Sequence, residues 1–146
     1  MGTARAGIKK PGRRDLTIIE LNPGAVCAAV FTQNAFCAAP VIVARQQLAQ
    51  TSPRYLLINT GNANAGTGAQ GLHDAEACCA ALAQHAQCSS NAILPFSTGV
   101  IGEPLSVEKI LHGIPEAYAN LNANGWDDAA HSIMTTDTVA KAASRT

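Results

Sequence analysis

The sequence predicts an α/β fold built from one domain. Its 146 residues suit a single domain, and 47% of them are apolar, which is enough for a core at this length. Short β-rich apolar runs alternate along the chain with longer stretches in which apolar residues recur at helical spacing. Strands are expected from Leu16, Ala25, Arg54 and Ala92, and helices from Pro40, Gly71, Ser106 and Trp126.

Charge and hydropathy exclude several classes of partner. Ten basic residues balance ten acidic residues, and charged residues make up only 14% of the sequence. No electrostatic field therefore favours nucleic acid or an anionic membrane. No apolar run approaches the roughly eighteen residues of a membrane span, and the basic N-terminus lacks the apolar stretch of a secretory signal. The expected compartment is the cytoplasm.

The cysteines favour reduced thiols over disulfides or a metal site. An odd number cannot all pair within the chain, which has Cys27, Cys37, Cys78, Cys79 and Cys88. His85 and Cys88 lie three residues apart, but no matching second pair of ligands completes a zinc pattern. We expect no bound metal, and we expect Cys27 and Cys37 to behave as small buried apolar residues.

The first part of the chain predicts a loop, a hairpin and a helix. Residues 7–14 are basic and contain a Pro-Gly pair, which is typical of a surface loop. Residues 16–21 and 25–32 are β-rich runs separated by Asn22-Pro23-Gly24, a sequence that favours a tight turn. Residues 39–50 place proline in a first helical turn and then show helical spacing.

A glycine-rich stretch, GNANAGTG at residues 61–68, links the strand expected at 54–59 to the helix expected at 71–87. Strand, glycine loop and helix is the order in which phosphate-binding loops are built. The stretch lacks the Lys-Ser/Thr pair of a P-loop, and its spacing is not GxGxxG. Two interpretations stay open: nucleotide binding, or a sharply turned loop whose asparagine side chains cap backbone groups.

A second break follows the apolar run at residues 92–96, where STGVIG begins at Ser97. Small hydroxyl residues and glycines there can present side-chain hydroxyls and unobstructed backbone N–H groups. Composition alone favours a tight turn leading to the next helix, for which Ser106 is a good N-cap. A binding site built on the break is the alternative.

The last informative segment runs from Trp126 to Thr138. Asp127 and Asp128 suit the first turn of a helix, because carboxylates there interact favourably with the helix dipole. Three hydroxyls then surround one carboxylate in TTDT, residues 135–138. This cluster suits either a helix cap, which composition favours, or the fixing of a small polar ligand.

Five segments in order resemble the ornithine acetyltransferase family, the glutamate N-acetyltransferases of arginine biosynthesis. They are AGIKKPGRRDL, AVFTQNAFCAAPV, GNANAGTG, STGVIGEPL and GWDDAAHSIMTTDT. The resemblance covers nearly the whole chain, and the combination is more specific than any single segment. It implies a layered α-β-β-α arrangement related to self-processing N-terminal nucleophile proteins.

The resemblance also implies an activity and a partner. Family members transfer acetyl from N-acetylornithine to glutamate, and some also use acetyl-CoA as donor, through an acetyl-threonine that becomes an N-terminus when a precursor cleaves itself. The family's cleavage segment lies beyond residues 144–146, so Thr146 is not assigned as the nucleophile. We expect residues 1–146 to form one domain of an α chain, inactive alone, whose β-chain partner carries the nucleophile in an α2β2 heterotetramer. No cofactor is expected.

Four site residues follow from the resemblance. Thr98 and Gly99 match the pair that forms the family's oxyanion hole, and Thr135, or as second choice Thr136, matches its substrate-binding threonine. GNANAGTG would then help to wall the amino-acid site. The alternative is a non-catalytic small-molecule or nucleotide-binding domain.

Overall fold

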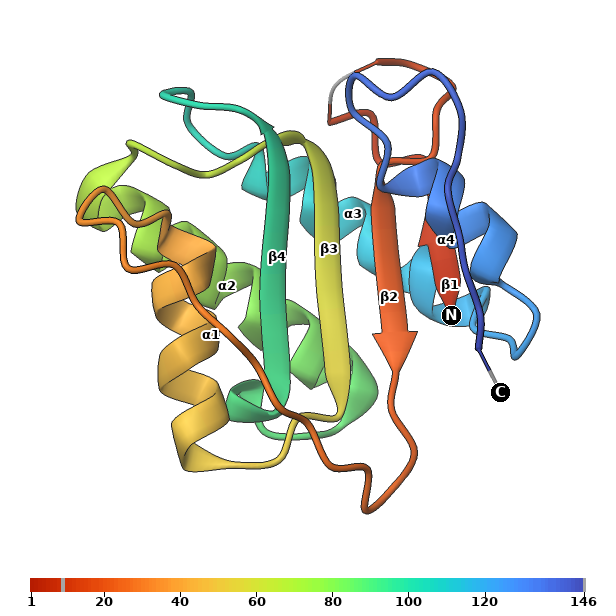
Figure 1. The fold of residues 1–146 in the computed structure, drawn as a ribbon, viewed down its shortest axis with the longest axis horizontal. Helices are drawn as coiled ribbons and strands as arrows, with labels where there is room; N and C mark the ends of the chain where they lie inside the picture. The colour runs from red at the N-terminus through yellow and green to blue at the C-terminus, as the bar shows by residue number, and fades with distance from the viewer. Residues whose placement is uncertain (9, 146) are drawn as a thin grey trace.

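Four strands form one mixed sheet in the order β1-β2-β3-β4 (Figure 1). They are β1 (Gly2–Ala4), β2 (Leu16–Glu20), β3 (Tyr55–Asn62) and β4 (Ile93–Val100). The β1-β2 and β2-β3 pairs are antiparallel, whereas β3 and β4 are parallel. This computed structural model describes residues 1–8 and 10–145. Thr146, the residue left unassigned above, lies outside the described residues.

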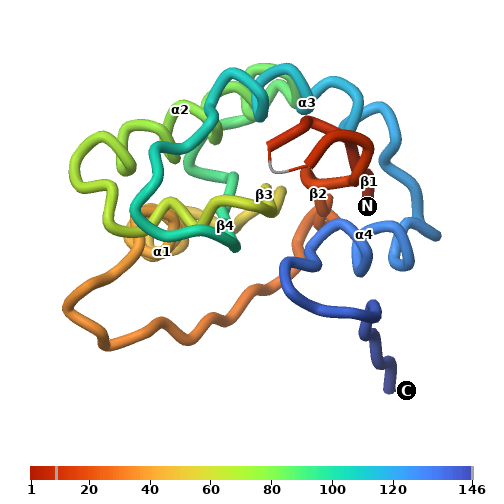
Figure 2. The backbone as a smooth tube through the Cα atoms, turned by 90° about the horizontal axis from the view of Figure 1, so that it is seen from above, coloured from red at the N-terminus to blue at the C-terminus, as the bar shows by residue number. Residues whose placement is uncertain are grey.

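Helices cover mainly one face of this sheet. They are α1 (Ala39–Gln50), α2 (Gly68–Ala86), α3 (Val107–Ala119) and α4 (Trp126–Ser132), with a short 3-10 turn at Ser90–Ala92. Figure 2 shows α2 and α3 side by side above the sheet, α1 beside β4, and α4 on the other side near β1. Among the described residues, no helix is both long and apolar enough to cross a membrane.

The core lies between the sheet and the α2-α3 layer. Alternate residues of a strand point to opposite faces, so Leu16 and Ile18 of β2 enter this layer together and are fully buried. Ile110 and Ile114 of α3 lie one helical turn apart and meet them from above, at 1% and 2% exposure. Burying each such side chain stabilises the fold by about 1.5–3 kcal/mol. The core thereby fixes the strand ends that carry the candidate site.

The predicted α/β class is confirmed, as are the four helices and, for residues 7, 8 and 10–14, the surface loop. The hairpin is wrong, because residues 25–32 form no strand in the described structure. Val26 and Val30 of that run are 96% and 99% exposed. A β-rich sequence becomes a strand only where a neighbour supplies backbone partners, and none of the strand pairings in the described residues includes this run. The strand that pairs with this edge of β2 is instead β1, whose Gly-Thr-Ala sequence has no β pattern.

The cysteines also differ from expectation in part. All five are free, and Cys78 and Cys79 are buried in α2. Cys27 and Cys37 are only half-buried, so their predicted burial is wrong. Both lie in the irregular segment that precedes α1.

Candidate active site

The candidate site lies where the parallel strands β3 and β4 end. Their register places Thr60 beside Thr98 and Gly61 beside Gly99. The two glycine-rich stretches therefore leave the sheet side by side at the carboxyl ends of their strands, which is where α/β sheets commonly bind ligands. We call residues 61–68 the asparagine loop and residues 97–102 the threonine-glycine loop.

The asparagine loop is held by its own side chains. Asn62 Nδ2 donates to the carbonyls of Glu103 and Pro104 at 3.1 and 3.0 Å, and Asn62 Oδ1 accepts from the backbone N–H of Asn64 at 2.7 Å. Asn64 Nδ2 donates to the carbonyl of Gly71 at 2.8 Å. The Asn64 side chain is fully buried. The interpretation that these asparagines cap backbone groups is confirmed.

The threonine-glycine loop keeps a hydroxyl free. Ser97 Oγ donates to Asn59 Oδ1 at 2.6 Å, which fixes the start of the loop. The Thr98 side chain is half-buried and makes no hydrogen bond to the described residues. It is therefore available as a donor to a ligand at the strand end.

Gly99 brings the two loops into direct contact. Its φ of 138° is a conformation that residues with a side chain rarely adopt. A Cβ there would lie 2.3 Å from the carbonyl carbon of Gly61 and 2.6 Å from the backbone nitrogen of Asn62. Only glycine fits this approach, which accounts for its place after Thr98.

The TTDT segment contributes one threonine to the same region. Thr135 is half-buried and lines a small recess together with Thr60, the strand neighbour of Thr98. Thr136 is exposed and does not line this recess. Helix α4 ends at Ser132 and no helix follows in residues 133–145, so the helix-cap interpretation of this segment is wrong.

Two residues of this region were not identified from the sequence. Thr60 is buried at the end of β3, and its hydroxyl has no partner among the described residues. Arg13, in the predicted surface loop at residues 7–14, lines the recess with it. The missed signal is Asp15, whose carboxylate accepts from the N–H groups of Ala6 and Ile8 at 2.7 and 2.6 Å. These bonds fold the basic loop back over the sheet.

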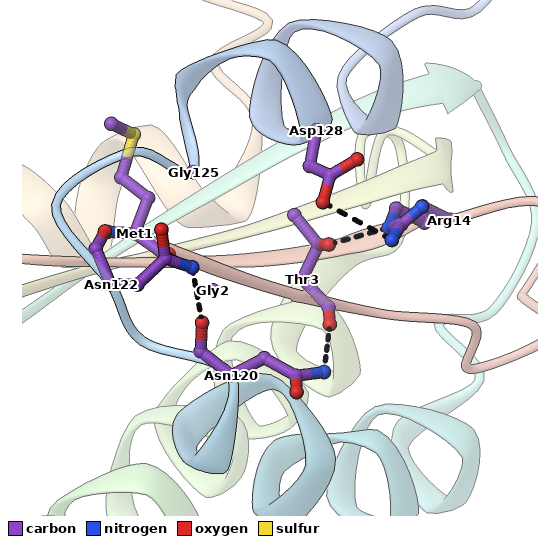
Figure 3. Close-up of a pocket in the computed structure, with 8 residues that line it drawn as sticks. All are labelled: Met1, Gly2, Thr3, Arg14, Asn120, Asn122, Gly125 and Asp128. Atoms are coloured by element: carbon purple, nitrogen blue, oxygen red, sulfur yellow. Dashed lines mark hydrogen bonds and ion pairs between the residues drawn. The ribbon is translucent and has the colours of Figure 1, made fainter.

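A separate polar cavity of about 160 Å³ lies beside β1 (Figure 3). The Arg14 side chain makes two contacts in this cavity: Nη2 lies 3.1 Å from Asp128 Oδ2, and Nε donates to Thr3 Oγ1 at 2.8 Å. Asn120 Nδ2 donates to the carbonyl of Thr3 at 3.0 Å. Because these polar groups already pair with one another, the cavity anchors the basic loop rather than offering free ligand contacts.

The titratable groups on α2 are remote from this chemistry. His73 and His85 are exposed, and the His85 ring packs edge-on against the Tyr118 ring, with the ring centroids 4.9 Å apart. Burial raises the pKa of Cys78 and of Cys79 to about 12, so both thiols stay protonated at neutral pH. Within the described residues, no cluster of His, Cys, Asp and Glu is placed to hold a metal.

Fold and site together define an α/β protein that gathers threonine hydroxyls at the carboxyl ends of two parallel strands. The model of the ArgJ family matches residues 1–146. The arginine biosynthesis bifunctional protein ArgJ of Methylococcus capsulatus is 56% identical over 145 residues, covering 99% of this chain and 35% of the relative. ArgJ of Pseudomonas fluorescens is 54% identical, with 99% and 36% covered.

Solved structures agree with these relatives. An ornithine acetyltransferase from Mycobacterium tuberculosis, in complex with ornithine, matches with a TM-score of 0.86 at 38% identity, covering 94% of this chain and 76% of that one. ArgJ of Bacillus halodurans matches with a TM-score of 0.82 at 35% identity, covering 94% and 74%. This chain belongs to the ArgJ family, and the resemblance seen in its sequence is confirmed. It spans about a third of the length of the curated relatives it matches.

Proposed function

We propose that this chain forms part of the active site of an acetyltransferase of arginine biosynthesis, which moves acetyl from N-acetylornithine to glutamate. The observation that carries the proposal is the unbonded Thr98 hydroxyl, held beside Gly99 where β3 and β4 end. Membership of a family whose members are named for arginine biosynthesis and ornithine acetyltransferase supports it. The sequence expectation of a cytoplasmic enzyme belongs to the same proposal.

The proposed chemistry divides between this chain and a partner. A threonine on a β chain attacks the acetyl carbonyl, and its own free amine takes the hydroxyl proton. The amide C–N bond then breaks, and ornithine leaves with the proton held by that amine. The amine of glutamate next attacks the threonine ester; its proton passes through the threonine amine to the threonine oxygen as the ester C–O bond breaks and N-acetylglutamate leaves. Each half passes through a tetrahedral oxyanion.

Thr98 and Gly99 are the proposed donors to that oxyanion. Donors fixed before the reaction stabilise the charge as it develops, because they need no reorganisation at that moment. The contact between Gly99 and the asparagine loop supplies such rigidity. Thr135 is the proposed substrate-binding threonine of the same pocket, since it lies beside the strand neighbour of Thr98.

An activity assay tests this assignment. We would compare the chain alone with a full-length version, in which it is followed by the remaining segments of its relatives. The full-length version should cleave before a threonine, as mass spectrometry would show, and transfer acetyl to glutamate. The chain alone should show no transfer, and turnover by the purified chain would overturn the division of roles.

Calorimetry separates this function from the nucleotide-binding alternative. The full-length version should bind N-acetylornithine and not ATP, because the polar side chains of the asparagine loop are occupied within the fold. Binding of ATP by the full-length version would instead favour a nucleotide site.

A further inference from the structure

A buried hydroxyl without a partner marks an unassigned contact at the end of β3. Thr60 is 4% exposed, and its Oγ1 has no hydrogen-bond partner among the described residues. Its backbone N–H is already used, donating to the carbonyl of Asp15 at 2.9 Å. Buried polar groups are nearly always paired in native proteins, so an unpaired one calls for an explanation such as a missing ligand.

The Thr60 side chain lines a recess of about 20 Å³. That volume holds one water-sized group, such as a single oxygen atom of a ligand. Thr135 and Arg13 line the same recess. A wider groove of about 370 Å³ shares Arg13 and Met134 with it, so the remainder of a ligand has space next to the bound oxygen.

The charge at the recess is positive. Lys10 and Arg13 line it, and neither has an ion-pair partner in the described part of the chain. Arg14 and Asp15 line the recess as well, but Arg14 pairs with Asp128 and the Asp15 carboxylate accepts two backbone N–H groups. The other ionisable side chains of the groove are Arg5, Asp127, Asp128 and His131, and Asp127 Oδ2 lies 3.6 Å from His131 Nδ1.

We propose that this recess binds a carboxylate of the amino-acid substrate, with Arg13 as the charged partner and Thr60 as a hydrogen-bond donor. An arginine fork matches the two oxygens of a carboxylate, and hydroxyl donors complete its coordination. Thr60 pairs with Thr98 in the sheet register, which puts the subsite next to the proposed oxyanion hole. The identity of the ligand rests on the proposed function, whereas the preference for a carboxylate rests on the recess.

Calorimetry on the full-length version, with N-acetylornithine and its carboxamide analogue, tests the subsite. The acid should bind at least about tenfold more tightly than the amide, because only the acid is an anion. Arg13→Gln should abolish this preference, and Arg13→Lys should keep part of it. Thr60→Val should weaken binding of the acid several-fold.

Matched controls exclude general effects of charge and of hydroxyl loss. Arg45→Gln removes the same charge from α1, and Thr17→Val removes another buried, unpaired hydroxyl that does not line the recess. Both should bind like wild type.

Three results would overturn the subsite: equal binding of acid and amide, no binding of either, or an unchanged preference in both Arg13→Gln and Thr60→Val. The acetyl-transfer assay distinguishes the two claims. Preferential binding of the acid without any transfer would leave the carboxylate subsite standing and remove the proposed function.

Discussion

The asparagine loop and the threonine-glycine loop leave the sheet side by side, but they use their polar groups in opposite ways. In the first, the Asn64 side chain is fully buried and bonded at both ends, to Gly71 and to the hydroxyl of Thr67. In the second, Thr98 is half-buried and unbonded. Glycine-rich composition does not distinguish them. The difference comes from the asparagine side chains. Because the amide group of Asn64 both donates and accepts hydrogen bonds within the fold, the asparagine loop is a rigid structural element.

The asparagine loop is hydrogen-bonded directly to the threonine-glycine loop. Ala63 N–H donates to the carbonyl of Val100, and Gly102 N–H donates to the carbonyl of Ala65, both at 2.8 Å. Together with the close approach of Gly99, these bonds fix the backbone that carries Thr98. We therefore expect substitutions in the asparagine loop to lower the free energy of unfolding, and substitution of Thr98 to lower kcat.

Gly99→Ala should give the largest loss of stability, because it breaks the contact between the loops. The new methyl would collide with backbone that cannot rotate away, and the φ of 138° would be strained. We expect the free energy of unfolding to fall by about 3 kcal/mol or more, as measured by urea denaturation. Gly102→Ala is the control: its φ of 80° is also positive, but the space around it is open, so it should cost about 1 kcal/mol. Equal losses would contradict a specific contact at Gly99.

Asn64→Ala should give the next largest loss. It removes two hydrogen bonds, from Asn64 Nδ2 to the carbonyl of Gly71 and from the Thr67 hydroxyl to Asn64 Oδ1, which costs about 2–3 kcal/mol in total. Asn34 is a matched exposed asparagine, whose side chain accepts only from the N–H of Phe36. Asn34→Ala should change the free energy of unfolding by less than about 0.5 kcal/mol. A loss at Asn64 no greater than at Asn34 would remove the supporting role of the loop.

Thr60→Val should act in the opposite direction. Removing a buried hydroxyl that has no partner should stabilise the chain by about 1 kcal/mol, and Thr17→Val should do the same. Thermal denaturation of both variants checks this. A loss of stability on Thr60→Val would show that its hydroxyl is paired within the fold, and would weaken the case for a ligand there.

The smallest effect concerns the thiols of α2, the helix that follows the supporting loop. Burial raises the folded-state pKa of Cys78 and Cys79 from an ordinary 9.0 to about 12. The unfolded chain therefore loses these protons first as the pH rises, and stability falls from about pH 8 upward until the folded pKa is reached. Together they should cost about 0.7 kcal/mol between pH 8 and pH 9.

Denaturation of a Cys78→Ala, Cys79→Ala variant at both pH values isolates this effect. The loss of stability attributable to the thiols should disappear in the variant, and an unchanged loss would contradict their burial.

A separate measurement checks that the cysteines are reduced and metal-free. Titration of the denatured wild type should find five thiols, and elemental analysis should find no stoichiometric zinc.

Local pattern was sufficient for much of this fold. Helical spacing predicted α1 and α3, and the apolar runs predicted β2, β3 and β4. Residues 25–32 failed because strand formation depends on a partner elsewhere in space, and β1 was missed because its pairing with β2 leaves no mark in three small residues.

The candidate site also contains residues that local sequence predicts and residues that it does not. Thr98, Gly99 and Thr135 could be proposed from the sequence because they stand in motifs, whereas the recess depends on long-range placement. Thr60 meets Thr135 only through the strand register and the return of the chain after α4. Neither is visible in the local sequence.

The most direct test of the account is to make the same change, threonine to alanine, in each loop of the full-length version and compare kcat. Thr98→Ala removes a donor that acts mainly in the transition state, so kcat should fall about 10²- to 10³-fold. KM should change little. Thr67→Ala removes a bond within the supporting loop, so it should cost about 1 kcal/mol of stability and leave kcat within about threefold of wild type.

Self-cleavage passes through its own tetrahedral intermediate, so only molecules that mass spectrometry shows to be processed should be compared. The account predicts the large loss of kcat in processed Thr98→Ala and not in processed Thr67→Ala. A processed Thr98→Ala enzyme with kcat within about threefold of wild type would fall far outside the loss expected for an oxyanion donor, and would contradict the assignment.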